Sequence, residues 1–309
     1  MLVTFDSIPA KADQPNEDFV AATPDAVVLL DGAGTPAGSE SGCIHGVTWF
    51  VRQLGSALLS SLMGSDDSDP AGCLAASIAA VRSLHADTCD LSHPGSPSAT
   101  VVALRERKSI IQYAVLADSV LLLSLSDGLR VVTDAREVQV GKQFRTEMDA
   151  TPNGTPDHDK ALRNYIEKLR AHRNRPGGFG VASAEPDAAA EALTGTVPCH
   201  QLRAAALLSD GASRLVDRFG LVTWDDALRT LATAGPSELL RQVRAAENGD
   251  LEGSRWPRGK VHDDATAAYC VDCALSALTH HESALADCVK HQPRSTSEVS
   301  AKTDNTSLP

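Results

Sequence analysis

The residues of this chain best suited to chemistry are acidic side chains that recur where apolar segments end. Asp31 directly follows the apolar run at residues 26–30 and is flanked by Gly32 and Gly34. These glycines permit positive φ and close approach of the backbone to a ligand. Asp210 and Gly211 repeat the arrangement after the apolar run at residues 202–208. The acids placed in this way are Glu17, Asp18, Asp31, Asp118, Asp210 and Asp263, with Asp264 as an added neighbour.

Recurrent carboxylates of this kind indicate a site for hard cations. Oxygen ligands suit hard cations, whereas zinc calls for clusters of His or Cys. Any one of these acids is equally typical of an ordinary turn, so the indication rests on their recurrence. Crowded carboxylates without cations would repel one another and raise one another's pKa. A two-metal hydrolytic site, in which the cations activate a water molecule, accounts for the whole set.

Short apolar runs predict the strands that must position these acids. Residues 19–20 are expected to pair with residues 28–30 across a turn at residues 23–25, which brings Glu17 and Asp18 beside Asp31. The runs between residues 100 and 133 are joined by short turns and predict a four-stranded antiparallel meander, with Asp118 in one turn. The expected strands are residues 2–5, 27–30, 100–104, 110–116, 120–125, 129–133, 202–208 and 267–271.

Apolar residues at steps of three and four predict helices over residues 44–62 and 74–84, packed on a sheet. His45 and His85 lie on these helices and are interpreted as surface or cap residues rather than as ligands. The same periodicity returns over residues 224–231 and again after Ser237, a plausible N-cap. These later helices are expected to cover a second sheet.

Residues 141–200 differ in composition from the strand and helix segments around them, because Gly, Pro, Asn and Asp are frequent. One helix is expected there, near residues 159–171. Basic side chains gather there, and a basic insertion beside carboxylates could recruit a phosphorylated or acidic substrate. A solvated helix face is the alternative. Residues 274–309 contain too little apolar surface to pack and predict a largely disordered tail with one short helix near residues 282–290.

Composition narrows the class of protein. The 309 residues are 42% hydrophobic and 22% charged, as in an ordinary globular protein. A net charge of −12 argues against nucleic acid and anionic membrane as partners. The N-terminus lacks a basic region followed by an apolar core, so a cytoplasmic protein is expected. The seven cysteines are scattered, and the C-x-x-C pair at Cys270 and Cys273 has no second pair with which to form a zinc site.

The order of the acidic motifs resembles that of the PPM-type (type 2C) metal-dependent serine/threonine phosphatases. The resemblance covers about residues 3–272. Its six segments are Asn16-Glu17-Asp18, Asp31-Gly32-Ala33-Gly34, Ser98-Ala99-Thr100, Ala117-Asp118-Ser119, Ser209-Asp210-Gly211 and Asp263-Asp264-Ala265-Thr266. Each segment alone is nonspecific, and the indication lies in six of them in the right order.

The resemblance implies an α+β fold, namely a four-layer α-β-β-α sandwich of two antiparallel sheets flanked by helices. The phosphatase domain is expected over residues 1–273, with 141–200 as a flap-like insertion beside the active site. The implied cofactors are two Mn²⁺ or Mg²⁺ ions, with Asp118 at the position associated with a third, weaker metal. The implied metal ligands are Glu17, Asp31, Gly32, Asp118, Asp210 and Asp263.

Within that set, the resemblance implies that Asp31 bridges the two ions and that the Gly32 carbonyl binds one of them. The resemblance implies that Asp31, Asp210 and Asp263 act catalytically through a metal-bound water and that Glu17 contributes largely through water. The resemblance gives Asp18 and Asp264 supporting roles.

Four positions depart from the family pattern. Asp13 stands where many members carry a phosphate-binding Arg, and Lys11 nearby is the candidate substrate-binding cation in its place. Ala33 stands where some members have a His that could act as a general acid. Asp264 replaces the usual Asn, and Val120 stands where Arg is common.

The favoured hypothesis is a protein phosphatase that hydrolyses phosphoserine or phosphothreonine in a protein or peptide. The alternative is a catalytically weak or inactive pseudophosphatase that binds a phosphoprotein partner. The missing Arg and His favour the alternative, and the intact carboxylates oppose it.

Overall fold

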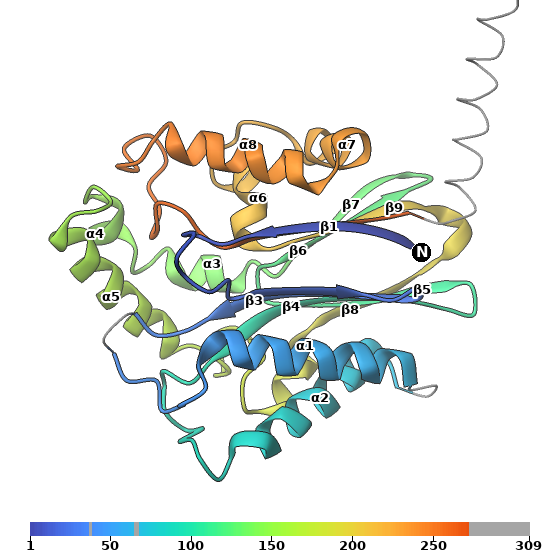
Figure 1. Cartoon of the computed structure of the whole chain (residues 1–309), viewed down its shortest axis with the longest axis horizontal. Helices are drawn as coiled ribbons and strands as arrows, with labels where there is room; N and C mark the ends of the chain where they lie inside the picture. The colour runs from blue at the N-terminus through green and yellow to red at the C-terminus, as the bar shows by residue number, and fades with distance from the viewer. Residues whose placement is uncertain (37–38, 65–67, 272–309) are drawn as a thin grey trace, which may run out of the picture. The chain divides into compact units, whose positions relative to one another are not determined.

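Two antiparallel five-stranded sheets face each other at the centre of the computed structural model (Figure 1). The structure describes residues 1–36, 39–64 and 68–271, all within the unit Met1–Asp272. The predicted tail at 274–309 and Cys273 of the C-x-x-C pair lie outside the described residues. The two-sheet sandwich expected from the sequence is confirmed.

The first sheet, called the β1 sheet, has the strand order β1-β10-β9-β6-β7. Its strands are β1 (Leu2–Ile8), β6 (Val120–Leu125), β7 (Gly128–Val132), β9 (Leu202–Leu208) and β10 (Ala265–Val271). The second, called the β3 sheet, has the order β2-β3-β4-β5-β8. Its strands are β2 (Asp18–Ala22), β3 (Ala26–Ala33), β4 (Ser98–Arg107), β5 (Ile110–Leu116) and β8 (Leu193–Pro198).

Helices cover the outer face of each sheet (Figure 1). Helices α1 (Gly46–Gly64) and α2 (Pro70–His85) pack on the β3 sheet. Helices α6 (Asp210–Asp217), α7 (Trp224–Ala234) and α8 (Pro236–Asn248) pack on the β1 sheet. None of the helices within the described ranges is long and apolar enough to cross a membrane.

The central strands are buried on both faces. In β3, Val27 and Leu29 join the core between the sheets, whereas Val28 and Leu30 join the core under α1 and α2. Both sets of side chains are apolar, so these strands appear in the sequence as continuous apolar runs without alternation.

The predicted meander is wrong in one respect. β4 pairs with β5 and β6 pairs with β7, but β5 belongs to the β3 sheet and β6 to the β1 sheet. Residues 117–119 therefore carry the chain from one sheet to the other, and Ala117 adopts a φ of 67° there. Asp118 lies in this crossover rather than in a hairpin turn.

Two smaller expectations about helix ends are also wrong. Helix α8 is capped by Gly235 and starts with Pro236, so Ser237 lies inside the helix. Proline suits the first turn because its missing N–H would have no helical partner there. His85 is the last residue of α2 and is only 3% exposed, so it is not a surface residue.

The segment between β7 and β9 lies in part at one end of the sandwich, where α3 (Arg136–Gly141), α4 (Thr146–Asp149) and α5 (Pro156–Arg170) are found (Figure 1). A small apolar cluster that includes Val140, Leu169 and Phe179 holds this segment together. The chain then returns through the 3₁₀ helix η1 (Pro186–Glu191) to β8, which pairs with β5, and the 3₁₀ helix η2 (Cys199–Gln201) leads on to β9.

Candidate metal centre

The predicted acids lie at one end of the sandwich because the strands that carry them are antiparallel. β3 and β9 end there, whereas β2 and β10 begin there. Asp18 at the start of β2 is the register partner of Asp31 near the end of β3. The Gly32 N–H donates to the backbone carbonyl of Glu17 at 3.1 Å, which holds Glu17 beside the same strand.

Asp31 and Asp210 come from different sheets and meet at this end. The backbone N–H of Asp210, the first residue of α6, donates to the Oδ2 atom of Asp31 at 3.2 Å. This contact places the carboxylate that follows β9 next to the carboxylate at the end of β3. The repeated Asp-Gly arrangement in the sequence therefore marks two sides of one site.

Asp263 is paired with two cations that the sequence analysis did not identify. Its Oδ1 atom accepts from the Lys260 ammonium at 2.7 Å, and its Oδ2 atom accepts from Arg214 at 2.6 Å. Arg214 also pairs with Glu247 at 2.6 Å, and that carboxylate is fully buried. Arg214 could have been found, because it lies four residues after Asp210 on α6 and so shares its helix face.

Asp264 has a role in backbone positioning. Its Oδ1 atom accepts from the Ala10 N–H at 2.6 Å and its Oδ2 atom from the Glu17 N–H at 2.8 Å. It thus ties the loop between β1 and β2, which carries Glu17, to the start of β10. The two N–H donors need two acceptor oxygens, which gives a physical reason for Asp rather than Asn at this position.

Asp118 lies in the crossover between the sheets, where Thr133 donates to its backbone carbonyl at 3.1 Å. Burial raises the pKa of Asp118 well above its usual value, and the neighbouring charges of Glu137 and Asp210 raise it further. Burial also raises the pKa of Glu137 to about 7, with the Arg173 guanidinium opposing that shift. Glu137 comes from α3, and nothing in the sequence marked it.

Burial and mutual repulsion disfavour charge on the principal carboxylates. Burial raises the pKa of Asp31 well above its usual value, and Asp18 and Asp210 add to the shift by repulsion. Burial raises the pKa of Asp18 to about 7, although the hydroxyls of Thr266 and Ser209 oppose the change. Neither carboxylate oxygen of Asp18 has a well-formed hydrogen bond within the described residues.

Asp263 behaves differently, because its two cations outweigh its burial. Burial opposes ionisation, but Lys260 and Arg214 hold the pKa of Asp263 below its usual value. For Asp210, burial and the charge of Asp263 raise the pKa, while Arg214 and Lys260 lower it. The centre thus contains carboxylates that lack compensating charge beside one that is already paired.

This arrangement fits divalent cations. Three observations indicate a site that needs added positive charge. The carboxylates converge, their pKa values are raised, and neither Asp18 oxygen makes a well-formed hydrogen bond within the described part of the chain. The donors are oxygens, which is the set that magnesium and manganese prefer. The predicted ligands lie at this end of the sandwich, and their binding of metal stays a prediction: they are Glu17, Asp31, Gly32, Asp118, Asp210 and Asp263.

The predicted substrate cation Lys11 is exposed in the loop between β1 and β2. Two arginines from the segment after β7 also lie at this end: Arg170 donates to the Gly34 carbonyl in the loop that follows Asp31, and Arg173 lies close enough to Glu137 to affect its pKa. The basic segment therefore reaches the carboxylate end of the sandwich.

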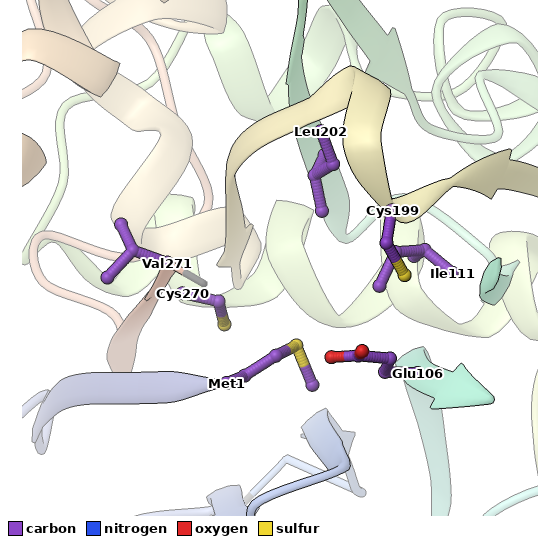
Figure 2. A pocket seen from close by; sticks show the side chains of 7 residues that line it. All are labelled: Met1, Glu106, Ile111, Cys199, Leu202, Cys270 and Val271. Carbon is purple, nitrogen blue, oxygen red and sulfur yellow. The ribbon is translucent and has the colours of Figure 1, made fainter. Parts of the chain in front are cut away.

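A separate pocket opens at the other end of the same strands. Figure 2 shows that its lining comes from both sheets, with Met1 and Cys270 on one side and Glu106, Ile111 and Cys199 on the other. Leu202 begins β9 and Val271 ends β10, which puts the pocket at the opposite ends of these strands from Asp210 and Asp263. This pocket lacks the carboxylate cluster and is not the candidate site.

Comparisons with known proteins concern the fold and the family. Solved structures with a similar fold include the serine/threonine phosphatase PstP/Ppp of Mycobacterium tuberculosis, 17% identical, with a TM-score of 0.50 over 87% of this chain and 97% of that chain. Stp1 from Staphylococcus aureus is 12% identical, with a TM-score of 0.50 over 87% and 94%. A bacterial serine phosphatase is 13% identical, with a TM-score of 0.51 over 88% and 97%.

These likenesses show the fold. A search of curated protein sequences gives no match. The family model described as protein phosphatase 2C matches residues 9–245, which is most of the chain and includes every predicted metal ligand except Asp263. The chain therefore belongs to the protein phosphatase 2C family of metal-dependent serine/threonine phosphatases.

Proposed function

We propose that the carboxylate cluster holds two Mn²⁺ or Mg²⁺ ions and that the protein hydrolyses phosphoserine or phosphothreonine in a protein or peptide. The observation that carries this proposal is the contact between Asp31 of the β3 sheet and Asp210, the first residue of α6, within a group of carboxylates short of positive charge. The bound cations supply the charge that acidifies a water molecule and neutralises the phosphoryl oxygens.

The residues of this chain hold and orient that centre. Asp31, the Gly32 carbonyl, Asp210 and Asp263 would hold the two ions. Glu17 is held in reach by its two backbone hydrogen bonds, through Gly32 and Asp264. Asp18 is buried beside Asp31 and would support the site, while Asp118 in the crossover would serve a third, weaker ion.

Lys260 is the cation we assign to substrate phosphate in addition to the predicted Lys11. Its side chain is 54% exposed and lies at 2.7 Å from Asp263. An ammonium at that position can turn to a phosphoryl oxygen once Asp263 shares its charge with a cation. This assignment fills the role of the Arg that Asp13 replaces.

A non-catalytic phosphoprotein-binding module is not favoured. The carboxylates converge in the structure, and the chain belongs to a family of phosphatases. The proposal includes the cytoplasmic location predicted from the sequence and the predicted absence of nucleic acid and membrane as partners.

The test is hydrolysis of a phosphopeptide and of p-nitrophenyl phosphate by the full chain with Mn²⁺, Mg²⁺ or a chelator. We expect activity that requires the metal and that Asp31→Asn and Asp210→Asn abolish while the proteins still melt cooperatively. Asp127→Asn, in the exposed hairpin between β6 and β7, is the matched control and should keep full activity. An inactive wild type that binds Mn²⁺ poorly by calorimetry would instead support the pseudophosphatase.

The phosphate-binding cation is tested by comparing Lys260→Met with Lys11→Met. We expect Lys260→Met to raise KM for the phosphopeptide more than Lys11→Met does. Lys108→Met, in the hairpin at the far end of β4 and β5, should leave KM unchanged. An unchanged KM in Lys260→Met would remove Lys260 from substrate binding.

A further inference from the structure

Two cysteines and two histidines gather on the helix-covered side of the β3 sheet, outside the carboxylate centre. Cys43 and His45 come from the loop that leads into α1, and His85 and Cys89 come from the end of α2 and the turn after it. One ligand atom from each of the four residues lies within 4.8 Å of all the others. The sequence separates the two pairs, and the packing of α1 against α2 brings them together.

Four of the six distances among these atoms are close to the edges of a tetrahedron around one zinc ion. Zinc bonds of about 2.3 Å to sulfur and about 2.0–2.1 Å to nitrogen give edges of roughly 3.4–3.8 Å between tetrahedral ligands. The two Sγ atoms lie 3.4 Å apart. The Cys43 Sγ atom lies 3.7 Å from His45 Nδ1 and 3.6 Å from His85 Nδ1, and the Cys89 Sγ atom lies 3.4 Å from His45 Nδ1.

The local backbone holds the four side chains in these positions. The Cys89 N–H donates to the His85 carbonyl at 3.0 Å, so the chain after α2 turns back and places Cys89 beside His85. The Asp90 N–H donates to the Gly42 carbonyl at 2.8 Å, which ties this turn to the loop before α1. Gly42 has a φ of 70°, a conformation that favours glycine.

The two imidazoles are oriented toward the sulfurs. His45 stacks on Trp49 of α1 with ring centroids 4.3 Å apart. His85 is 3% exposed, and its Nε2 atom has no hydrogen-bond partner within residues 1–36, 39–64 and 68–271. Its Nδ1 atom faces Cys43, so the polar contact of this buried ring is directed into the cluster.

We propose that Cys43, His45, His85 and Cys89 bind a structural zinc ion. Two thiols lose their protons to solvent, two neutral imidazoles donate nitrogen lone pairs, and the resulting complex of Zn²⁺ with two thiolates has no net charge. A neutral centre suits a site whose Cys43 and His85 are buried. A tetrahedral set of two sulfurs and two nitrogens selects zinc over the hard cations of the carboxylate centre.

The zinc would fix the start of α1 beside the phosphatase site. Val47 follows the ligand pair by two residues, and a Cβ on Gly32 or Gly34 would lie 2.5 or 2.4 Å from its methyl groups. The first turn of α1 therefore packs directly on the glycines around Asp31. The zinc ion links the loop that precedes this turn to the end of α2.

A disulfide between Cys43 and Cys89 is the competing account. The sulfurs are unbonded at 3.4 Å, whereas a disulfide bond is about 2.05 Å long. A disulfide would also leave both imidazoles without a function. The experiment therefore measures metal and thiol state on the same samples.

The full chain is expressed in zinc-supplemented medium, passed through a chelator that strips the carboxylate centre, and analysed for zinc by mass spectrometry. We expect one zinc ion per chain, and cobalt substitution should give the visible absorption of a tetrahedral thiolate site. Cys89→Ser and His45→Asn should lose the zinc and melt at a lower temperature. Cys199→Ser and His200→Asn, at η2 beyond the far ends of the strands, are matched controls and should keep it.

The double variant Asp31→Asn with Asp210→Asn separates the two sites, because it should lose Mn²⁺ binding and retain zinc. If the proposed phosphatase function is wrong, the zinc content expected for this variant stays the same. The zinc proposal is overturned if the wild type contains free thiols but takes up neither zinc nor cobalt, or if Cys89→Ser keeps its zinc. It is also overturned if Cys43 and Cys89 form a disulfide in zinc-replete protein purified without reductant.

Discussion

Replacing Asp264 by Asn tests whether this residue positions Glu17. The two carboxylate oxygens accept from the N–H groups of Ala10 and Glu17, at 2.6 and 2.8 Å. An asparagine keeps one acceptor and presents an NH₂ group to the other N–H. Asp264→Asn therefore loses one hydrogen bond to a charged acceptor and leaves one donor unpaired, without a change in side-chain volume.

The expected size of the effect follows from that geometry. A hydrogen bond to a charged group contributes about 1.5–3 kcal/mol, and a partly exposed site such as this one falls in the lower part of that range. A loss of about 1.5–2 kcal/mol lowers Tm by roughly 3–8 °C in a domain of this size. Because Glu17 is a proposed ligand, Asp264→Asn should also weaken Mn²⁺ binding.

Calorimetry of thermal unfolding and of Mn²⁺ binding measures both effects. Asp264→Ala, which removes both acceptors, should lose more stability than Asp264→Asn. Asp127→Asn makes the same chemical change in an exposed hairpin and should leave both quantities unchanged. If Asp264→Asn unfolds and binds Mn²⁺ as the wild type does, Asp264 does not hold the Glu17 loop.

Two further predictions concern the carboxylate centre. The pKa of Asp18 is about 7 when folded, above its usual value when unfolded, so the folded metal-free state binds the extra proton. The metal-free protein should therefore lose stability as pH rises from about 4 to about 7. In thermal melts of chelator-treated protein, Asp18→Asn should reduce the dependence of Tm on pH over this range. An unchanged dependence would contradict the raised pKa of Asp18. Gly32→Ala places a Cβ 2.5 Å from the Glu17 carbonyl oxygen and should lower the free energy of unfolding by about 1–3 kcal/mol. The same variant should lose the metal-dependent activity. Gly64→Ala, with no atom within 4 Å, is its control, and a normal melt for Gly32→Ala would refute the packing argument.

The strand-end acids could be predicted because two local signals coincide. An apolar run followed by Asp-Gly shows both the strand and its end, and an antiparallel sheet returns such ends to the same edge. The pairing of Asp18 with Asp31 was expected from the turn at residues 23–25 and is found in the register. Local sequence was enough here because the residues involved are neighbours on a hairpin.

The crossover at Asp118 could not be recognised in the same way. β5 and β6 are both apolar, and three residues between them look like a hairpin turn. Which sheet a strand joins depends on cores that form over long separations, and both faces of these strands are apolar. The sequence therefore predicted the strands and the turn but not the change of sheet.

The charged residues around Asp263 were missed for a related reason. Lys260 lies three residues before Asp263 in a loop rich in Gly, Arg and Pro, where a cation is more often solvated. Glu137 reaches the site from α3, in a segment whose path the sequence did not define. Side chains that approach a site from its rim leave no periodic signal.

The cysteine and histidine ligands were not predicted because their two pairs lie far apart in the sequence. Cys43 and His45 are separated from His85 and Cys89 by two helices, so neither pair alone suggests a zinc site. His85 ends α2, and His is a common residue at helix ends. Only the packed structure shows that the His85 side chain is buried. Cys43 and Cys89 are 46 residues apart in the sequence, yet their Sγ atoms lie 3.4 Å apart.

The two ligand sets can work side by side because they differ in kind. Thiolates and imidazoles select zinc, whereas carboxylates and a backbone carbonyl select magnesium or manganese. The ligand type of each centre therefore helps to keep out the metal of the other. Only the first turn of α1 separates the loop of Cys43 and His45 from Gly32. Glycine at position 32 is what permits Val47 to pack there, so the position of α1 and the position of Asp31 depend on each other. A zinc ion that fixes the start of α1 would therefore stabilise the strand end that carries Asp31 without contacting the substrate.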